Sequence, residues 1–152
     1  MPSGKVHTRA SLVLTASGFP VALWTCDPLA GLACAAGSAS GVVLSPDLDV
    51  DHKTESEEVV WRWGCVFGIA FMTYWLPYGL VMPHRSFWSH FPVVSTSIRV
   101  VYGFWWLVPL SFAIRLTPGP LFWWYFAWWF AGLCLSDAAH WMMDKLSKKR
   151  KG

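Results

Sequence analysis

MPHRSFWSHF, residues 82–91, decides how this chain can fold, because it places two histidines, an arginine and two serines between long apolar segments. The sequence of 152 residues is 55% hydrophobic and 17% aromatic, with 14% charged residues and twelve tryptophans. This composition differs from that of an ordinary soluble domain and indicates an integral membrane protein. The polar stretch is then expected at the edge of the bilayer, where its side chains meet water or compensating groups.

Apolar runs predict an all-α fold, and several of them are long enough to span a bilayer, for which about 20 residues are needed. They cover residues 10–25, 28–44, 59–82, 91–115 and 119–136. We expect about four transmembrane helices, with the run 59–82 forming one re-entrant or interfacial helix. The first two runs are rich in Ala, Gly and Ser, which allows close helix packing. Between them, Asp27 is a candidate N-cap and Pro28 a first helical residue.

The polar residues lie at the ends of these runs. Suppose that runs one and two form one hairpin, that runs four and five form another, and that 59–82 starts and ends on the same face of the membrane. Four polar segments then share that face: those around His7, 47–52, 84–90 and 137–144. If instead 59–82 crosses the bilayer, His84 and His90 lie opposite Asp47. The basic residues favour a shared, cytoplasmic face that also holds both termini. We therefore expect one membrane-embedded domain, 1–144, and a basic cytoplasmic tail, 145–152.

The spacing at the end of the last run is that of a metal clamp. On a helix, Asp137, His140 and Asp144 are three and four residues apart and project from one side. In PDLDVD, Asp47 and Asp49 lie close enough to repel unless a cation or a proton intervenes. Imidazole with carboxylate suits zinc, manganese or iron, and we expect zinc first.

Each of these features also has an ordinary structural interpretation. The HxxxD spacing occurs by chance in many helices, and DLDVDH can be a solvated acidic loop. The histidines at 84 and 90 can be interfacial anchors. The metal site is favoured because four separate segments bring His or Asp to one predicted face of a chain otherwise poor in such groups.

Four stretches, MPSGKVHTR, SPDLDVD, LPYGLVMPHRSFWSH and SDAAHWMMD, resemble a family of metal-binding membrane proteins of unknown function. More distantly, they resemble the membrane-bound metal-dependent hydrolases related to zinc-dependent phospholipase C. The resemblance is spread in order over most of the chain. It implies six metal ligands, with Asp49 as a further candidate: His7, Asp47, His84, His90, His140 and Asp144.

Two classes of function remain open. In a hydrolase, a bound divalent ion activates water, Asp49 or Asp137 accepts its proton, and Arg85 binds an anionic oxygen of a phosphoester or lipid headgroup. In a non-enzymatic membrane subunit, the metal fastens helix ends together, and the Trp-rich faces bind partner proteins. A structural metal site leaves no open coordination position, whereas a hydrolytic site keeps one.

Other partners and linkages are not expected. The net charge of +3 is small, and the basic residues lie where lipid phosphate competes, which argues against nucleic-acid binding. The four cysteines lie in apolar segments without a CxxC pair, and no disulfide is predicted.

Overall fold

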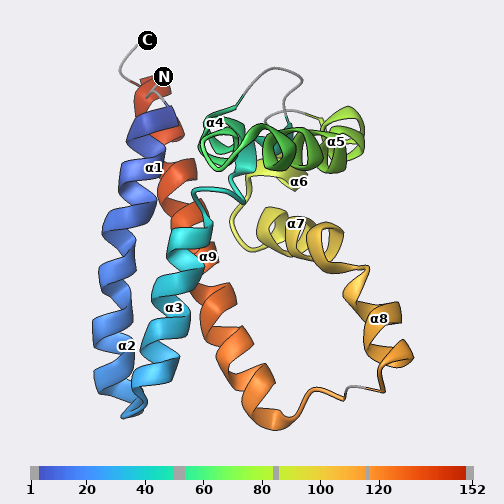
Figure 1. Cartoon of the computed structure of the whole chain (residues 1–152). Coiled ribbons are helices and arrows are strands. Elements are labelled where there is room, and N and C mark those ends of the chain that lie inside the picture. Colours follow the sequence, from blue (N-terminus) through green and yellow to red (C-terminus); the bar gives the residue numbers. More distant parts are fainter. Residues whose placement is uncertain (1–3, 50–53, 84–85, 116, 150–152) are drawn as a thin grey trace.

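The computed structural model describes residues 4–49, 54–83, 86–115 and 117–149, without the side chains of Asp49, Lys148 and Lys149 (Figure 1). Every regular element in these ranges is helical, which confirms the all-α prediction. The elements are α1 (Gly4–Val13), η1 (Leu14–Ser17), α2 (Gly18–Thr25), α3 (Pro28–Ser40), η2 (Pro46–Asp49), α4 (Glu55–Trp61), α5 (Cys65–Val81), α6 (Phe87–His90), α7 (Val94–Phe104), α8 (Leu107–Ala113) and α9 (Pro120–Lys149).

None of the helices in the described ranges is both long and apolar enough to cross a membrane, so the four expected transmembrane helices are not found among them. The predicted runs are interrupted. The run 59–82 breaks at Gly64, whose φ of 137° separates α4 from α5. The run 91–115 divides into α7 and α8. Helix α9 has 30 residues but continues past position 145, so part of the predicted tail is helical.

Three segments lie side by side: the rod α1–η1–α2, the helix α3 and the long helix α9 (Figure 1). Asp27 caps α3 as predicted, because its carboxylate accepts a hydrogen bond of 2.9 Å from Leu29 N. The contact between α3 and α9 is close: a Cβ added to Gly37 would lie 1.8 Å from Trp129 O. Ser38 Oγ donates to Gly132 O across the same contact, at 3.1 Å. Small residues therefore let the two backbones approach, as the composition of the second run predicts.

Helices α4, α5 and α6 lie across the end of this bundle that carries both termini (Figure 1). Leu48 of η2 packs with Trp75 and Tyr78 of α5 in a small hydrophobic core. Ser56 Oγ of α4 donates to Val42 O, at 3.0 Å, in the segment that follows α3. The run 59–82 thus packs against η2 through α5 and holds η2 in place.

A buried ion pair joins α7 to α9 and to the segment after α3. Arg99 donates to the carboxylate of Asp137 and to Leu44 O, and Thr96 donates to the same carboxylate. Arg99 and Asp137 are both fully buried. Two charges of opposite sign in direct contact compensate each other, whereas one alone in this place would be costly. The pair therefore fixes both the helix that carries His140 and the segment that leads to Asp47.

We expect Gly132→Ala to destabilise the fold, because the new Cβ would lie 2.0 Å from the main-chain oxygen of Cys34. Overpacking of this kind costs about 1–3 kcal/mol in the free energy of unfolding, measurable by denaturant titration. Gly119→Ala is the matched control, since nothing lies within 4 Å of a Cβ there. Equal stability of the two variants would contradict the close packing of α3 on α9.

We expect Arg99→Met to lower the free energy of unfolding by about 3–5 kcal/mol, because it leaves Asp137 buried without a counter-charge. The double variant Arg99→Met/Asp137→Asn removes both charges and should recover part of this loss. Arg62→Met, at an exposed arginine, should change stability by less than about 0.5 kcal/mol. A double variant as unstable as the single one would show that the two side chains are not coupled.

Candidate metal centre

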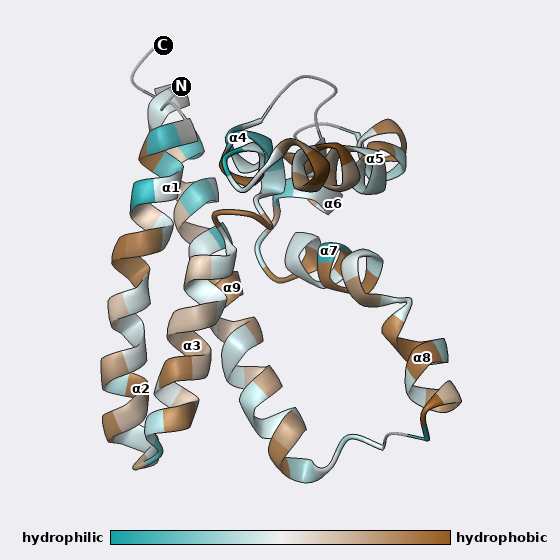
Figure 2. Ribbon diagram, viewed as in Figure 1, coloured by the Kyte–Doolittle hydropathy of each residue, from teal (hydrophilic) through white to brown (hydrophobic). Residues whose placement is uncertain are grey.

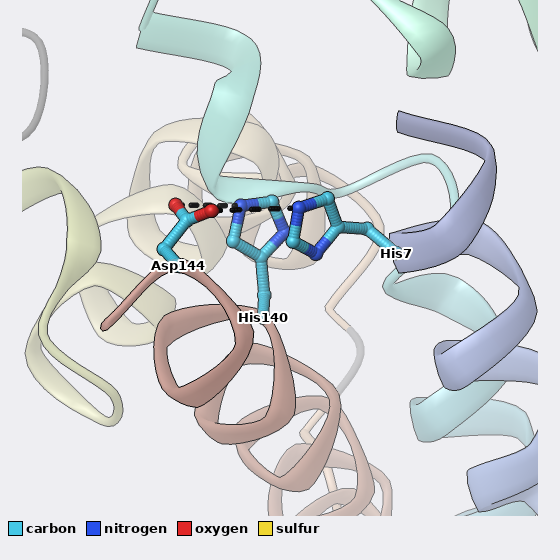
Figure 3. A group of neighbouring side chains, drawn as sticks. All are labelled: His7, His140 and Asp144. Atoms are coloured by element: carbon cyan, nitrogen blue, oxygen red, sulfur yellow. Dashed lines mark ion pairs between the residues drawn. The ribbon is translucent and has the colours of Figure 1, made fainter. Parts of the chain in front are cut away.

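Helices α1 and α9 bring His7, His140 and Asp144 together (Figure 3). The rings of His7 and His140 stack with centroids 3.8 Å apart and planes inclined by 16°. One helical turn along each helix, Ser11 Oγ and Ser136 Oγ form a hydrogen bond of 2.6 Å. The antiparallel pairing of these two helices therefore sets the register that places the two imidazoles in contact.

The short elements η2 and α6 complete the cluster with Asp47 and His90, which form a second group with His140. A capping box between Ser86 and Ser89 stabilises the N-terminus of α6, and His90 is the last residue of that helix. Ser89 Oγ lies 3.1 Å from Pro83 O, to which it donates, and 3.0 Å from Nδ1 of His90. Because a hydroxyl has one proton, this arrangement favours Nδ1–H of His90 as the donor to Ser89.

Four imidazole–carboxylate separations define the cluster. Nε2 of His140 lies 3.4 Å from Oδ1 of Asp47 and 3.6 Å from Oδ2 of Asp144. Nε2 of His7 lies 3.5 Å from Oδ1 of Asp144, and Nε2 of His90 lies 3.8 Å from Oδ1 of Asp47. Good N–H···O hydrogen bonds are shorter, at about 2.7–3.2 Å. Two ligands of one tetrahedral zinc ion, each about 2.0–2.2 Å from it, lie about 3.3–3.6 Å apart. Three of the four separations fit this range, and that between His90 and Asp47 is longer.

His140 belongs to both groups, and it presents the same atom, Nε2, to Asp47 and to Asp144. A neutral imidazole nitrogen has one lone pair and binds one metal ion. The two groups therefore overlap at His140, and each is a candidate set of three ligands for one ion. Nε2 of His140 and Nδ1 of His7 are buried and make no hydrogen bond within the part of the chain that the structure describes.

The charges of the cluster also call for a cation. Burial raises the pKa of Asp47, but the facing imidazoles of His140 and His90 lower it more, so this pKa lies well below its usual value. Burial also raises the pKa of Asp144, but His7 and His140 lower it more, so this pKa too lies below its usual value. Both carboxylates are thus ionised near neutral pH. A cavity of about 10 Å³ lies between His7, Asp47 and His140, which is about the space of one small ion or water molecule.

The structure brings together five of the six ligands predicted from the sequence: His7, Asp47, His90, His140 and Asp144. The sixth, His84, and the predicted anion-binding residue Arg85 lie outside the described residues, as does the side chain of Asp49. Asp137 lies elsewhere. Its carboxylate is fully buried against Arg99 and Thr96. The predicted role of Asp137 as a proton acceptor does not fit this place, and Asp137 is instead a residue that positions α9.

Arg99 is the important residue that the sequence analysis did not identify. It lies inside the run 91–115, where the other charged residue, Arg115, is at the end of the run. A single charge inside an apolar helix is rarely buried without a partner, and this was the available signal. The identity of that partner, Asp137, is not visible in the sequence, because 38 residues separate the two.

The free state of the cysteines agrees with the prediction, since all four are unpaired in the structure. They lie on different helices or their ends, and Cys34 is buried in the contact of α3 with α9. The cysteines thus contribute no ligand to the centre, whose donor atoms are nitrogen and oxygen among the described residues.

Comparison with known families identifies one match. The family model described as "Uncharacterized metal-binding protein (DUF2227)" matches residues 2–128, a span that includes His7, Asp47 and His90 and ends before His140. No curated protein and no solved structure matches the chain. The matched span covers most of the sequence, and the site described above holds imidazole and carboxylate ligands suited to a divalent ion. The chain therefore belongs to this family of uncharacterized metal-binding proteins.

Proposed function

We propose that this protein is a metal-dependent hydrolase that cleaves a phosphoester at the centre formed by His7, Asp47, His90, His140 and Asp144. The observation that carries the proposal is that these five side chains come from four elements and form two groups of three that share His140, with the ligand atoms of each group within 4.8 Å of one another. Zinc is the proposed ion, with manganese or iron as alternatives. The sequence resemblance to membrane-bound metal-dependent hydrolases supports the same reaction class.

When bound, the divalent ion supplies Lewis acidity and lowers the pKa of a water molecule at an open position. The residues of the chain then have separate tasks. His140, which faces both carboxylates, is the central nitrogen ligand. The side chain of Asp47 is 35% exposed, more than any other member of the centre, so it borders the entry of water. In the hydrolysis itself, the oxygen of water bonds to phosphorus, the ester P–O bond breaks, and a proton passes to the departing alcohol.

Three further residues belong to this proposal from their sequence positions. Asp49 follows Asp47 by two positions and is the proposed proton acceptor, and Arg85 lies between His84 and Ser86 as a group for an anionic oxygen. His84 is proposed as an additional ligand on the same basis.

The alternative function is a structural centre in a non-enzymatic membrane subunit. It is favoured by one observation: the candidate ligands come from α1, η2, α6 and α9. An ion bound by them would therefore hold the short elements η2 and α6 against α1 and α9. A zinc ion with four protein ligands keeps no position for water, and the five side chains offer more donors than these four positions need. Activity of the metal-loaded protein distinguishes the two functions, because only the hydrolase requires an accessible position.

Elemental analysis of the purified chain should find about one divalent ion per molecule. Asp47→Asn and Asp144→Asn should each lower metal affinity by at least about tenfold, because each removes a charged ligand. Hydrolysis of bis-p-nitrophenyl phosphate should be lost with them and on chelation. Asp27→Asn is the matched control, since Asp27 caps α3 far along the chain from the centre. Full metal content in both site variants would refute the centre. A wild-type chain that binds metal but does not hydrolyse the ester would favour the structural alternative.

We also propose that the protein contacts membrane lipid, with the metal centre and both termini at the cytoplasmic face. Large apolar side chains are exposed along α2, α8 and the start of α9, and also along α5 and α6. Helices α2 and α8 and the start of α9 lie away from the end that carries the termini (Figure 2). The exposed side chains on these three segments include Phe19, Leu23, Trp24, Val108, Phe112, Leu121 and Trp123. Exposed apolar surface of this extent is typical of a lipid or protein interface. The acyl region of a bilayer fits a surface spread over several helices, and a protein partner on the Trp-rich faces is the competing occupant.

The full chain should float with phosphatidylcholine vesicles in a density gradient. Phe19→Glu/Leu23→Glu should reduce the floating fraction severalfold, because it places two charges on the proposed lipid-facing surface. Met142→Glu/Leu146→Glu is the matched control, since it makes the same change on exposed residues near the metal centre. If the wild-type chain stays at the bottom of the gradient, or if both double variants float equally well, the lipid contact is wrong.

A further inference from the structure

A pocket of about 420 Å³ lies beside the metal centre, on the side formed by α6 and the end of α9. Two members of the centre, His90 and Asp144, form part of its wall, and the rest includes three aromatic rings and one lysine: Phe87, Phe91, Trp141 and Lys145. The volume lies within the range of about 300–1,000 Å³ that is typical of small-molecule sites. The pocket is distinct from the small cavity between His7, Asp47 and His140, which lies on the other side of the centre.

The aromatic wall is continuous across two elements. Phe87 and Phe91 are four residues apart, and their rings stack with centroids 4.6 Å apart. Phe91 meets Trp141 of α9 edge to face, with centroids 6.2 Å apart and planes at 80°. Phe87 and Phe91 are exposed, and Trp141 is partly exposed, so the rings offer an open apolar surface to a ligand. Rings in this arrangement accept a flat or chain-like apolar group.

Lys145 supplies a positive charge at the same pocket. Its Nζ lies 4.9 Å from the centre of the Trp141 ring, one helical turn earlier on α9, in a cation–π contact. The neighbouring carboxylate of Asp144 faces His7 and His140 on the side of the metal centre. A divalent ion in the centre would neutralise the two carboxylates, so that Lys145 leaves this pocket with a positive charge, which selects for an anion.

We propose that this pocket binds the substrate, and that the substrate is an anionic phosphoester with an adjacent apolar group. Lys145 contacts an anionic oxygen, the phosphorus end lies toward His90 and Asp144, and the apolar group packs on Phe87, Phe91 and Trp141. This inference rests on the proposed hydrolase function and adds the class of substrate. Either an aryl ester or the headgroup region of a lipid with its acyl chain offers this chemistry.

The test is calorimetric titration of the full chain with methylphosphonate, phenylphosphonate and hexylphosphonate, which share one anionic group and resist hydrolysis. The wild-type chain should bind at least one of the larger two about tenfold more tightly than methylphosphonate. A preference for phenylphosphonate indicates an aryl ester, and one for hexylphosphonate indicates a lipid. Equal affinities for all three would overturn the proposal.

Two variants separate the contributions of the wall. Trp141→Ala should abolish the preference while leaving methylphosphonate binding unchanged, and Trp63→Ala, at an exposed tryptophan outside the pocket, should preserve it. Lys145→Met should weaken all three ligands about tenfold, whereas Lys5→Met, which removes the same charge from α1, should not. A preference that survives Trp141→Ala, or Lys variants that behave alike, would contradict the proposed pocket.

The titrations are made with both zinc-loaded and metal-free protein, and metal content and thermal unfolding are measured for each variant. The aromatic preference should persist without metal, because it comes from the side chains of the pocket. A chain that binds no metal but keeps this preference would refute the proposed hydrolase centre and leave the pocket standing. A chain that binds metal but shows no preference would refute the pocket alone.

Discussion

The central constraint on this structure is the burial of three imidazoles and two carboxylates at the point where four elements meet. In each group of three, the ligand atoms lie within 4.8 Å of one another. Two ionised carboxylates in a partly buried cluster repel each other, and a buried imidazole nitrogen without a hydrogen bond costs about 1–3 kcal/mol. A divalent cation offsets both costs at once. The rest of the fold serves to hold its helices so that this cluster can form.

Two kinds of contact hold it. Small residues on α3 and α9 let the backbones of these two parallel helices approach. Helix α1 packs antiparallel to α9, and there the hydrogen bond between Ser11 and Ser136 lies one turn from the stack of His7 on His140. At the other side, the buried pair of Arg99 and Asp137 ties α7, α9 and the segment before η2 together. Asp137 and His140 are three residues apart, so one face of α9 is anchored by the ion pair and also presents the central ligand. A defect in the ion pair would therefore disturb the centre without touching a ligand.

The surroundings of the centre differ from side to side, and this asymmetry bears on function. One side is a cavity of about 10 Å³, with room for little more than an ion. The other opens to an aromatic pocket with a lysine at its edge. A centre that only fastened helices would need no such pocket. Membership of an uncharacterized metal-binding family is consistent with either use, so the pocket is the feature of this chain that favours catalysis.

The sequence alone was sufficient for the all-helical class, the cap of Asp27, the free cysteines and most of the candidate ligands, because each depends on local spacing or on the scarcity of polar residues in an apolar chain. It led to the wrong division of the helices, since apolar content does not reveal where Gly64 turns the backbone or where α7 ends. Only the tertiary structure decided which acids face the histidines. Asp137 and Asp144 both share a helical side with His140, yet one faces Arg99 and the other His7, and that choice depends on which helices pack against each part of α9. Local spacing determines which side chains point the same way, whereas packing between distant segments determines what they meet.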